Sequence, residues 1–105
     1  MKNNFTKNNK YLQQSLPQAQ LDFHGRGILS ETQIQDIAEK FIKDCLKQNL
    51  KKALIITGKG IHSKNKTSVV KPIITHLLLN STDVKSFYDS RVDRGFEGAI
   101  EIVFN

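Results

Sequence analysis

Two short segments of this sequence carry the residue types that acid–base chemistry on a phosphate group requires. Asp22 and His24 are separated by one residue, and a carboxylate beside an imidazole can move a proton to or from a reacting oxygen. Gly58-Lys59-Gly60 combines a cation with glycines, whose backbone can approach a phosphate closely and offer it amide groups. Each segment alone is unspecific, because Asp22 can also cap a loop and Gly-x-Gly is neither a dinucleotide fingerprint nor a Walker A loop. Together they are consistent with a phosphodiester site in which Asp22 and His24 act as acid and base. The alternative from spacing alone is that Asp22 caps a loop and His24 is an exposed or hydrogen-bonded polar residue.

Further cationic and polar residues flank both segments and extend the candidate site. Arg26 can bind a phosphate through two parallel hydrogen bonds, and His62 can contact phosphate, transfer a proton or remain a solvated loop residue. The predicted phosphate-binding residues are Gly25, Arg26, Gly58, Lys59, Gly60, His62 and Lys64. A divalent metal held by Asp22, His24 and His62 is an open alternative. The spacing matches no known zinc signature, so we assign no metal ligand and no certain cofactor.

The first half of the chain contains the elements that must position these residues. Residues 21–24 alternate apolar and polar side chains, which predicts a short strand with Asp22 and His24 on one face. Ser30 and Gln33 match a capping box, and an apolar stripe then predicts a helix over 31–49. The unbroken apolar run 53–57 predicts a buried central strand. A strand, helix, strand unit of this length implies parallel pairing, so the Asp22 pair and the Gly58 turn should border one crevice at the carboxyl ends of the strands.

The second half supplies one more helix and two strands. The helix is expected to begin near Thr67 or Ser68, with Pro72 in or near its first turn, and to end near Leu79. Strands are expected over 84–88 and 99–104, the last as a half-exposed edge strand because Glu101 interrupts its apolar residues. Two helices with one apolar stripe each can cover only one face of a sheet. The predicted fold is therefore an α/β protein of the α+β two-layer type: β-α-β-α-β-β, with a four-stranded mixed sheet and two helices on one face.

Length and composition limit the protein to one ordinary domain. Of the 105 residues, we expect 19–105 to form that domain and 1–18, rich in Asn, Gln and Lys, to be a flexible basic tail. No window is long and apolar enough for a membrane helix, and the first residues do not resemble a signal peptide, so we expect a cytoplasmic protein without a membrane partner. Cys45 is the only cysteine, which excludes an intrachain disulfide and favours a buried, inert thiol.

The charge of the chain favours a polyanionic partner, either DNA or RNA. The formal net charge is +6, and the interval from Asp44 to Asp83 holds seven lysines and no acid between these two residues. A merely solubilising basic surface is the alternative. The sequence does not distinguish DNA from RNA, because phosphate contacts carry no base identity, and it leaves the oligomeric state at monomer or weak dimer.

Three motifs in this sequence resemble those of the Smr, or small MutS-related, domain family. Residues 21–25, Leu-Asp-Phe-His-Gly, look like the family's Leu-Asp-Leu-His-Gly motif, with Phe23 in place of the usual leucine. Residues 57–60, Thr-Gly-Lys-Gly, resemble its His/Thr-Gly-x-Gly motif, and the segment from Gly95 to Val103 resembles its closing Gly-Gly-x-Gly-Ala strand entry. The resemblance covers about residues 20–104 and includes the order of the elements. A stand-alone Smr domain is the family assignment that follows.

The resemblance implies an endonuclease that cleaves or nicks structured DNA or RNA, with roles in DNA repair or recombination, or in ribosome rescue through cleavage of messenger RNA. It places Asp22 and His24 in catalysis and the Gly58 turn at the substrate. Phe96 and Glu97 depart from the closing motif: the aromatic ring and the acid could narrow the site, or Phe96 could stack on an unpaired base. A non-catalytic module that binds nucleic acid or ribosomes is the main alternative function. A domain that binds a small ligand or another partner is a third.

Overall fold

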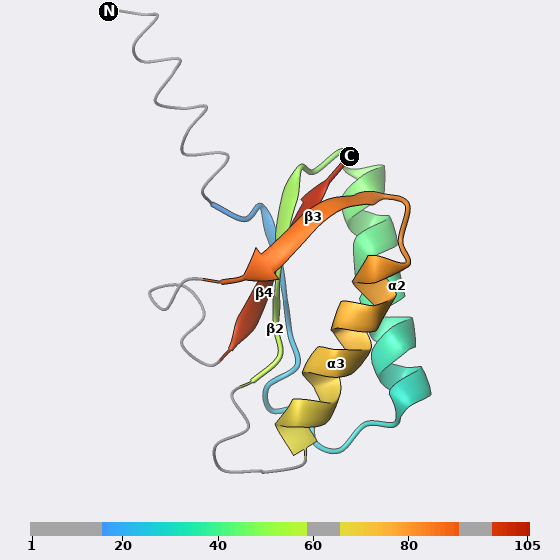
Figure 1. Ribbon diagram of the computed structural model, residues 1–105, viewed down its shortest axis with the longest axis vertical. Coiled ribbons are helices and arrows are strands. Elements are labelled where there is room, and N and C mark those ends of the chain that lie inside the picture. The colour runs from blue at the N-terminus through green and yellow to red at the C-terminus, as the bar shows by residue number, and fades with distance from the viewer. Residues whose placement is uncertain (1–15, 59–65, 91–97) are drawn as a thin grey trace, which may run out of the picture.

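The computed structural model describes residues 16–58, 66–90 and 98–105, and of residues 66–68 it describes only the backbone. Two helices lie over one face of a four-stranded sheet, as predicted (Figure 1). The elements in chain order are β1 (Ala19–Asp22), α2 (Glu31–Lys47), β2 (Lys52–Ile56), α3 (Lys66–Leu79), β3 (Val84–Asp89) and β4 (Ala99–Phe104).

The sheet is mixed, with the strand order β1-β2-β4-β3. β1 and β2 are parallel, as a crossover through α2 requires, whereas β4 is antiparallel to both β2 and β3. The carboxyl ends of β1 and β2 therefore meet the beginning of β4 at one edge of the sheet. In Figure 1 this edge is at the bottom, where α3 also begins.

The predicted start of the first helix is confirmed in its chemical detail. The Ser30 hydroxyl accepts a hydrogen bond from the Gln33 N–H (3.1 Å), and the Gln33 side chain accepts one from the Ser30 N–H (2.8 Å). The helix ends at Lys47, and Asn49 adopts a positive φ of 60° just beyond it. The capping box at Ser30 therefore fixes the residue at which the loop after β1 ends and α2 begins.

α3 differs from its prediction at its beginning. It starts at Lys66, so Pro72 lies inside the helix beyond its first turn. Pro72 has no N–H to donate to the carbonyl four residues earlier, and this costs helix stability. The apolar packing of Ile74 and Leu78, which are 0% and 2% exposed, offsets that cost.

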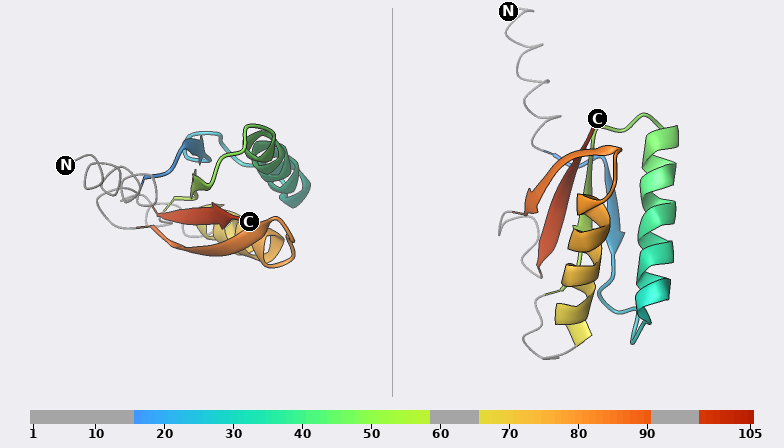
Figure 2. Two further views of the ribbon diagram at one scale, coloured as in Figure 1. Left: turned by 90° about the horizontal axis from the view of Figure 1, so that it is seen from above. Right: turned by 45° about the vertical axis from the view of Figure 1, so that its right-hand side comes forward.

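The core lies between the helices and the sheet face that they cover. α2 and α3 pack side by side on this face (Figure 2). The buried apolar cluster draws on both helices and on three strands, and its members are Leu21, Phe23, Ile34, Ala38, Ile42, Cys45, Ala53, Ile55, Ile74, Leu78, Ile100, Ile102 and Phe104.

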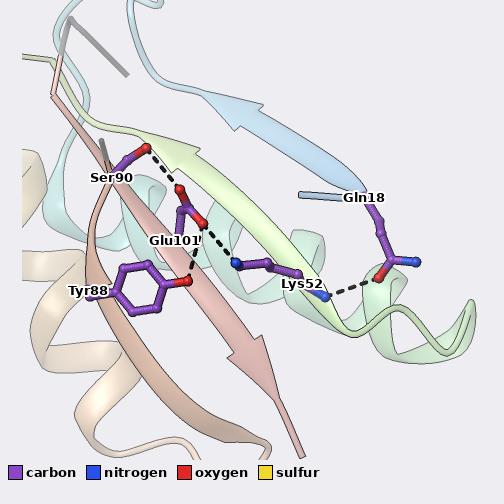
Figure 3. Close-up of polar contacts among 5 residues, drawn as sticks. All are labelled: Gln18, Lys52, Tyr88, Ser90 and Glu101. Carbon is purple, nitrogen blue, oxygen red and sulfur yellow. Dashed lines mark hydrogen bonds and ion pairs between the residues drawn. The ribbon is translucent and has the colours of Figure 1, made fainter. Parts of the chain in front are cut away.

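The prediction that the last strand is a half-exposed edge is wrong. β4 pairs on both sides, and Glu101, which alternation assigned to solvent, is 1% exposed. The Glu101 carboxylate is neutralised by Lys52 on β2, whose Nζ lies 3.1 Å from its Oε1. Tyr88 and Ser90 donate hydrogen bonds to the same carboxylate, at 3.3 and 3.2 Å (Figure 3). A charged residue can be buried in a central strand only with such partners.

Candidate functional site

Three segments that are distant in the sequence meet at the lower edge of the sheet. The N–H of Phe23 donates to the carbonyl of Ile56 (2.9 Å), which joins the end of β1 to the end of β2. The N–H groups of Thr57 and Gly58 both donate to the carbonyl of Gly98 (2.9 and 3.1 Å), which precedes β4. The structure thus brings the Asp22 segment and the beginning of the Gly58 turn together, as predicted.

The strand that carries Asp22 ends earlier than expected, because Asp22 itself begins a turn. β1 stops at Asp22, and the Asp22 Oδ1 accepts a hydrogen bond from the N–H of His24 (2.7 Å). Gly25 follows at a φ of +85°, a conformation that glycine adopts without steric cost. Both Asp22 and His24 are exposed. Within the described residues, the second carboxylate oxygen of Asp22 and the imidazole of His24 make no hydrogen bond, so they can meet a substrate.

Arg26 is held close to this turn by two contacts. Its Nε donates to the main-chain carbonyl of Asp22 (2.9 Å), and its guanidinium carbon lies 5.9 Å from the centroid of the Phe23 ring. The residue is exposed, and its two terminal nitrogens donate no hydrogen bond to any residue that the structure describes. The side chain is therefore partly preorganised, while its phosphate-binding fork remains available.

The Gly58 turn is described only at its beginning. Gly58 has a φ of +92°, which glycine tolerates, and its N–H is already bonded to Gly98. An amide contact to phosphate would therefore come from residues after Gly58. Lys59, Gly60, His62 and Lys64 lie outside the described residues, as do Phe96 and Glu97.

Several of the seven lysines between Asp44 and Asp83 lie away from this turn or are paired with a carboxylate. Lys52 is buried against Glu101, and Lys71 forms an ion pair with Asp89 at 2.9 Å. Lys47 and Lys51 lie where α2 ends and just before β2 begins, at the edge of the sheet opposite the Gly58 turn. β2 separates the two edges, and nearness in the sequence could not show this.

Other groups that could do chemistry lie away from the site. Cys45 is buried in the core, and burial, followed by the nearby Asp44 charge, raises the pKa of its thiol, which disfavours the reactive thiolate. His76 is exposed on α3 and contacts Asn80. Within residues 16–58, 66–90 and 98–105, no three His, Cys, Asp or Glu side chains gather in a way that could hold a metal ion. A divalent metal at Asp22, His24 and His62 therefore stays an open alternative, because His62 lies outside the described residues.

Sequence reasoning missed the polar cluster of Lys52, Tyr88, Ser90 and Glu101, because its members come from three segments whose pairing no local pattern reveals. It also missed a pocket of about 370 Å³ that lies between α2 and the end of α3. That pocket includes Glu39, Lys43 and His76 and is remote from the Asp22 turn. We therefore do not associate it with the candidate site.

Comparison with known proteins identifies the family of the domain. The family model described as "Smr domain" matches residues 21–105. A search of curated proteins finds no match. Among the helices that the structure describes, none is long and apolar enough to cross a membrane.

Two solved structures have the same fold. YdaL, a stand-alone small MutS-related protein from Escherichia coli, superposes with a TM-score of 0.73 at 24% identity over 85% of this chain and 66% of YdaL, so the match spans just under two thirds of that protein. The Smr domain of MutS2 from Thermus thermophilus superposes with a TM-score of 0.68 at 17% identity over 83% of this chain and 98% of that domain. Fold, motif order and family model agree: this chain belongs to the Smr domain family, a family of nuclease and nucleic-acid-binding domains.

Proposed function

We propose that this protein is an endonuclease that cleaves phosphodiester bonds in structured DNA or RNA, with messenger RNA on ribosomes as one candidate substrate. The observation that carries the proposal is the exposed Asp22 turn, at the edge where β1, β2 and β4 meet. There the Asp22 carboxylate accepts the main-chain N–H of His24, and the Asp22 carbonyl accepts a hydrogen bond from the Arg26 guanidinium. Membership of a nuclease family supports the same reaction class.

The proposed chemistry divides the work among these three side chains. The free carboxylate oxygen of Asp22 takes the proton of the attacking water or hydroxyl, while the His24 imidazolium gives a proton to the leaving oxygen. Arg26 donates to the non-bridging phosphoryl oxygens and stabilises the charge that develops on them. Lys59, Lys64, His62 and the amides of Gly25 and Gly60 complete the proposed substrate site.

The test measures cleavage and binding separately for the variants Asp22→Asn and His24→Ala. Cleavage is measured on branched DNA, single-stranded RNA and ribosome-bound message. We expect each substitution to lower the cleavage rate by about 10²- to 10⁴-fold, the range for losing a general acid or base, with affinity changed far less. Lys85→Ala is the matched control, because Lys85 is exposed near the start of β3, at the opposite end of the sheet. Undiminished cleavage by the Asp22→Asn/His24→Ala double variant would refute the proposal.

A non-catalytic nucleic-acid- or ribosome-binding module is the second candidate, and one observation favours it. The Asp22 Oδ1 already has a structural task, because it accepts the His24 N–H and shapes the turn. This candidate predicts salt-sensitive binding with no product from any of the three substrates. It also predicts that Asp22→Asn, which keeps an amide oxygen as acceptor, binds like the original protein.

A further inference from the structure

A second, apolar site lies directly beside the Asp22 turn. It is a pocket of about 200 Å³ between the loop that follows β1 and the first turns of α3. The buried side chains of Phe23 and Ile34 line its inner part, Gly27, Ile28 and Leu29 contribute from the loop, and Val69 and Val70 contribute from α3.

Two features of the pocket indicate a ligand rather than incomplete packing. Ile28 is 77% and Val69 is 45% exposed, so two large apolar side chains from different elements stand in solvent at the same opening. Every described lining residue is apolar or glycine, which excludes a charged group from the interior because its loss of hydration would not be compensated. The part of a ligand that enters must be uncharged and must present an apolar face to the lining, with its polar edges turned toward the opening.

The residues beside the pocket are charged, in contrast to its apolar lining. Phe23, whose ring lines the pocket, is also the ring over which the Arg26 guanidinium lies. The exposed Arg26 fork and the Asp22 turn therefore adjoin an apolar, aromatic-lined cavity. A nucleotide offers both complementary groups: a phosphate for the guanidinium and a flat base that stacks on aromatic and apolar side chains.

We infer that this pocket binds one unpaired nucleobase of the strand whose phosphate is held at Arg26. The inference rests on the proposed function and adds to it the form of the substrate. A base in a duplex cannot enter such a pocket without leaving its stack, so the site selects single-stranded, looped or flipped nucleotides. Specificity for strand structure then comes from the pocket, whereas the phosphate contacts supply affinity for any polyanion.

The test is an abasic scan with the full-length protein. Single-stranded oligodeoxynucleotides carry one abasic site, moved one position at a time, and their dissociation constants are compared with that of the intact strand at fixed low salt. Removing the base that occupies the pocket should weaken binding by about 5- to 100-fold, the range for one stacked base, at one position only. The phosphates are unchanged throughout the scan.

The variant Ile28→Asn/Val69→Asn makes the opening polar without adding charge, and both positions are exposed enough to spare the core. It should bind the intact strand about as weakly as the original protein binds the critical abasic strand, and its own scan should be flat. Leu79→Asn is the matched control, because Leu79 is 69% exposed at the far end of α3, and it should keep the position-dependent loss.

The outcomes separate this inference from the proposed function. A flat scan for the original protein, or an unchanged scan for the double variant, overturns the pocket assignment even if the protein cleaves its substrate. A position-dependent loss that the double variant abolishes supports the assignment even if no cleavage is found. A protein that binds no strand at all contradicts both.

Discussion

At the scale of single residues, the candidate site depends on how one carboxylate is used. One carboxylate oxygen of Asp22 accepts a hydrogen bond from the His24 N–H, and its main-chain carbonyl accepts one from the Arg26 Nε, so a single residue orients both His24 and Arg26. Its second oxygen makes no hydrogen bond to the described residues. The same residue can therefore shape the turn and still act on a substrate.

Arg26 should matter through the geometry of its guanidinium more than through its charge. Arg26→Lys keeps the charge but loses the Nε contact to Asp22 and the planar fork, so we expect affinity for single-stranded RNA to fall by a large fraction of the Arg26→Ala loss. Arg26→Ala should also lower the steepness of the salt dependence by roughly 0.7, the value for one phosphate contact on a single strand. Dissociation constants measured across a salt series check both effects. Equal affinity of Arg26→Lys and the original protein would contradict the assignment of Arg26, and Lys85→Ala is the control for charge alone.

At the scale of secondary structure elements, the central position of β4 depends on a buried ion pair. Burial lowers the pKa of Lys52, but hydrogen bonding to Tyr88 and Glu101 and their charges raise it by more. The pKa of Lys52 therefore lies above its usual value of 10.5. The ammonium group is thus retained in the folded protein at neutral pH. Its attraction to Glu101 helps to hold β2 and β4 in register, with Leu54 opposite Glu101.

Removing one partner of this pair should destabilise the fold strongly. Glu101→Gln leaves a buried ammonium without its carboxylate, and we expect a loss of about 3–5 kcal/mol in the free energy of unfolding. Lys52→Met/Glu101→Leu should recover much of that loss, with a remainder because Tyr88 and Ser90 lose their acceptor. Urea unfolding measures these differences. Lys71→Met is the control: its ion pair with Asp89 has side chains 47% and 73% exposed, so its loss should stay below about 1 kcal/mol. A small effect of Glu101→Gln would contradict this account.

The same pair predicts a pH dependence with a definite sign. Because the pKa of Lys52 is raised on folding, its contribution is fully present below its usual value of 10.5 and is lost as the pH rises through the folded-state pKa. At strongly alkaline pH, the free energy of unfolding of the original protein should therefore fall relative to that of the Lys52→Met/Glu101→Leu variant. Urea unfolding of both proteins over a pH series measures this change.

At the scale of the whole molecule, the net charge overstates the positive charge that lies near the candidate site. The chain has a net charge of +6, yet Lys52 and Lys71 are paired with carboxylates, and Lys47 and Lys51 lie at the edge remote from the site. The positive charge proposed to meet the substrate is therefore a smaller set: Arg26, Lys59, Lys64 and Lys66.

This smaller set predicts a moderate salt dependence of nucleic-acid binding. Three or four phosphate contacts should weaken binding to single-stranded RNA by roughly 10- to 50-fold between about 50 and 200 mM salt. Fluorescence anisotropy over a salt series gives the slope directly. A slope that implies most of the lysines would show that the remote edge also binds, and a slope near zero would contradict a phosphate-binding site.

The sequence by itself determined the main features that depend on local pattern, although it misplaced the end of β1 and the beginning of α3. Period-2 and helical apolar spacing identified the elements, the capping box identified the start of α2, and the motifs at Asp22 and Gly58 identified the family and the candidate site. These signals are local because hydrogen bonding and side-chain direction within a strand or helix repeat over a few residues.

Only the tertiary structure decided the features that depend on which segments become neighbours. The alternation of apolar and polar residues in β4 would be the same in an edge strand and in a central strand whose one acidic residue is neutralised. Only the pairing with β2 placed Lys52 against Glu101 and so decided between them. The opening formed by Ile28 and Val69 likewise exists only where the loop after β1 meets α3. The sequence showed that Asp22 has a carboxylate. Only the folded backbone decided that one of its oxygens accepts the His24 N–H while the other is left for a substrate.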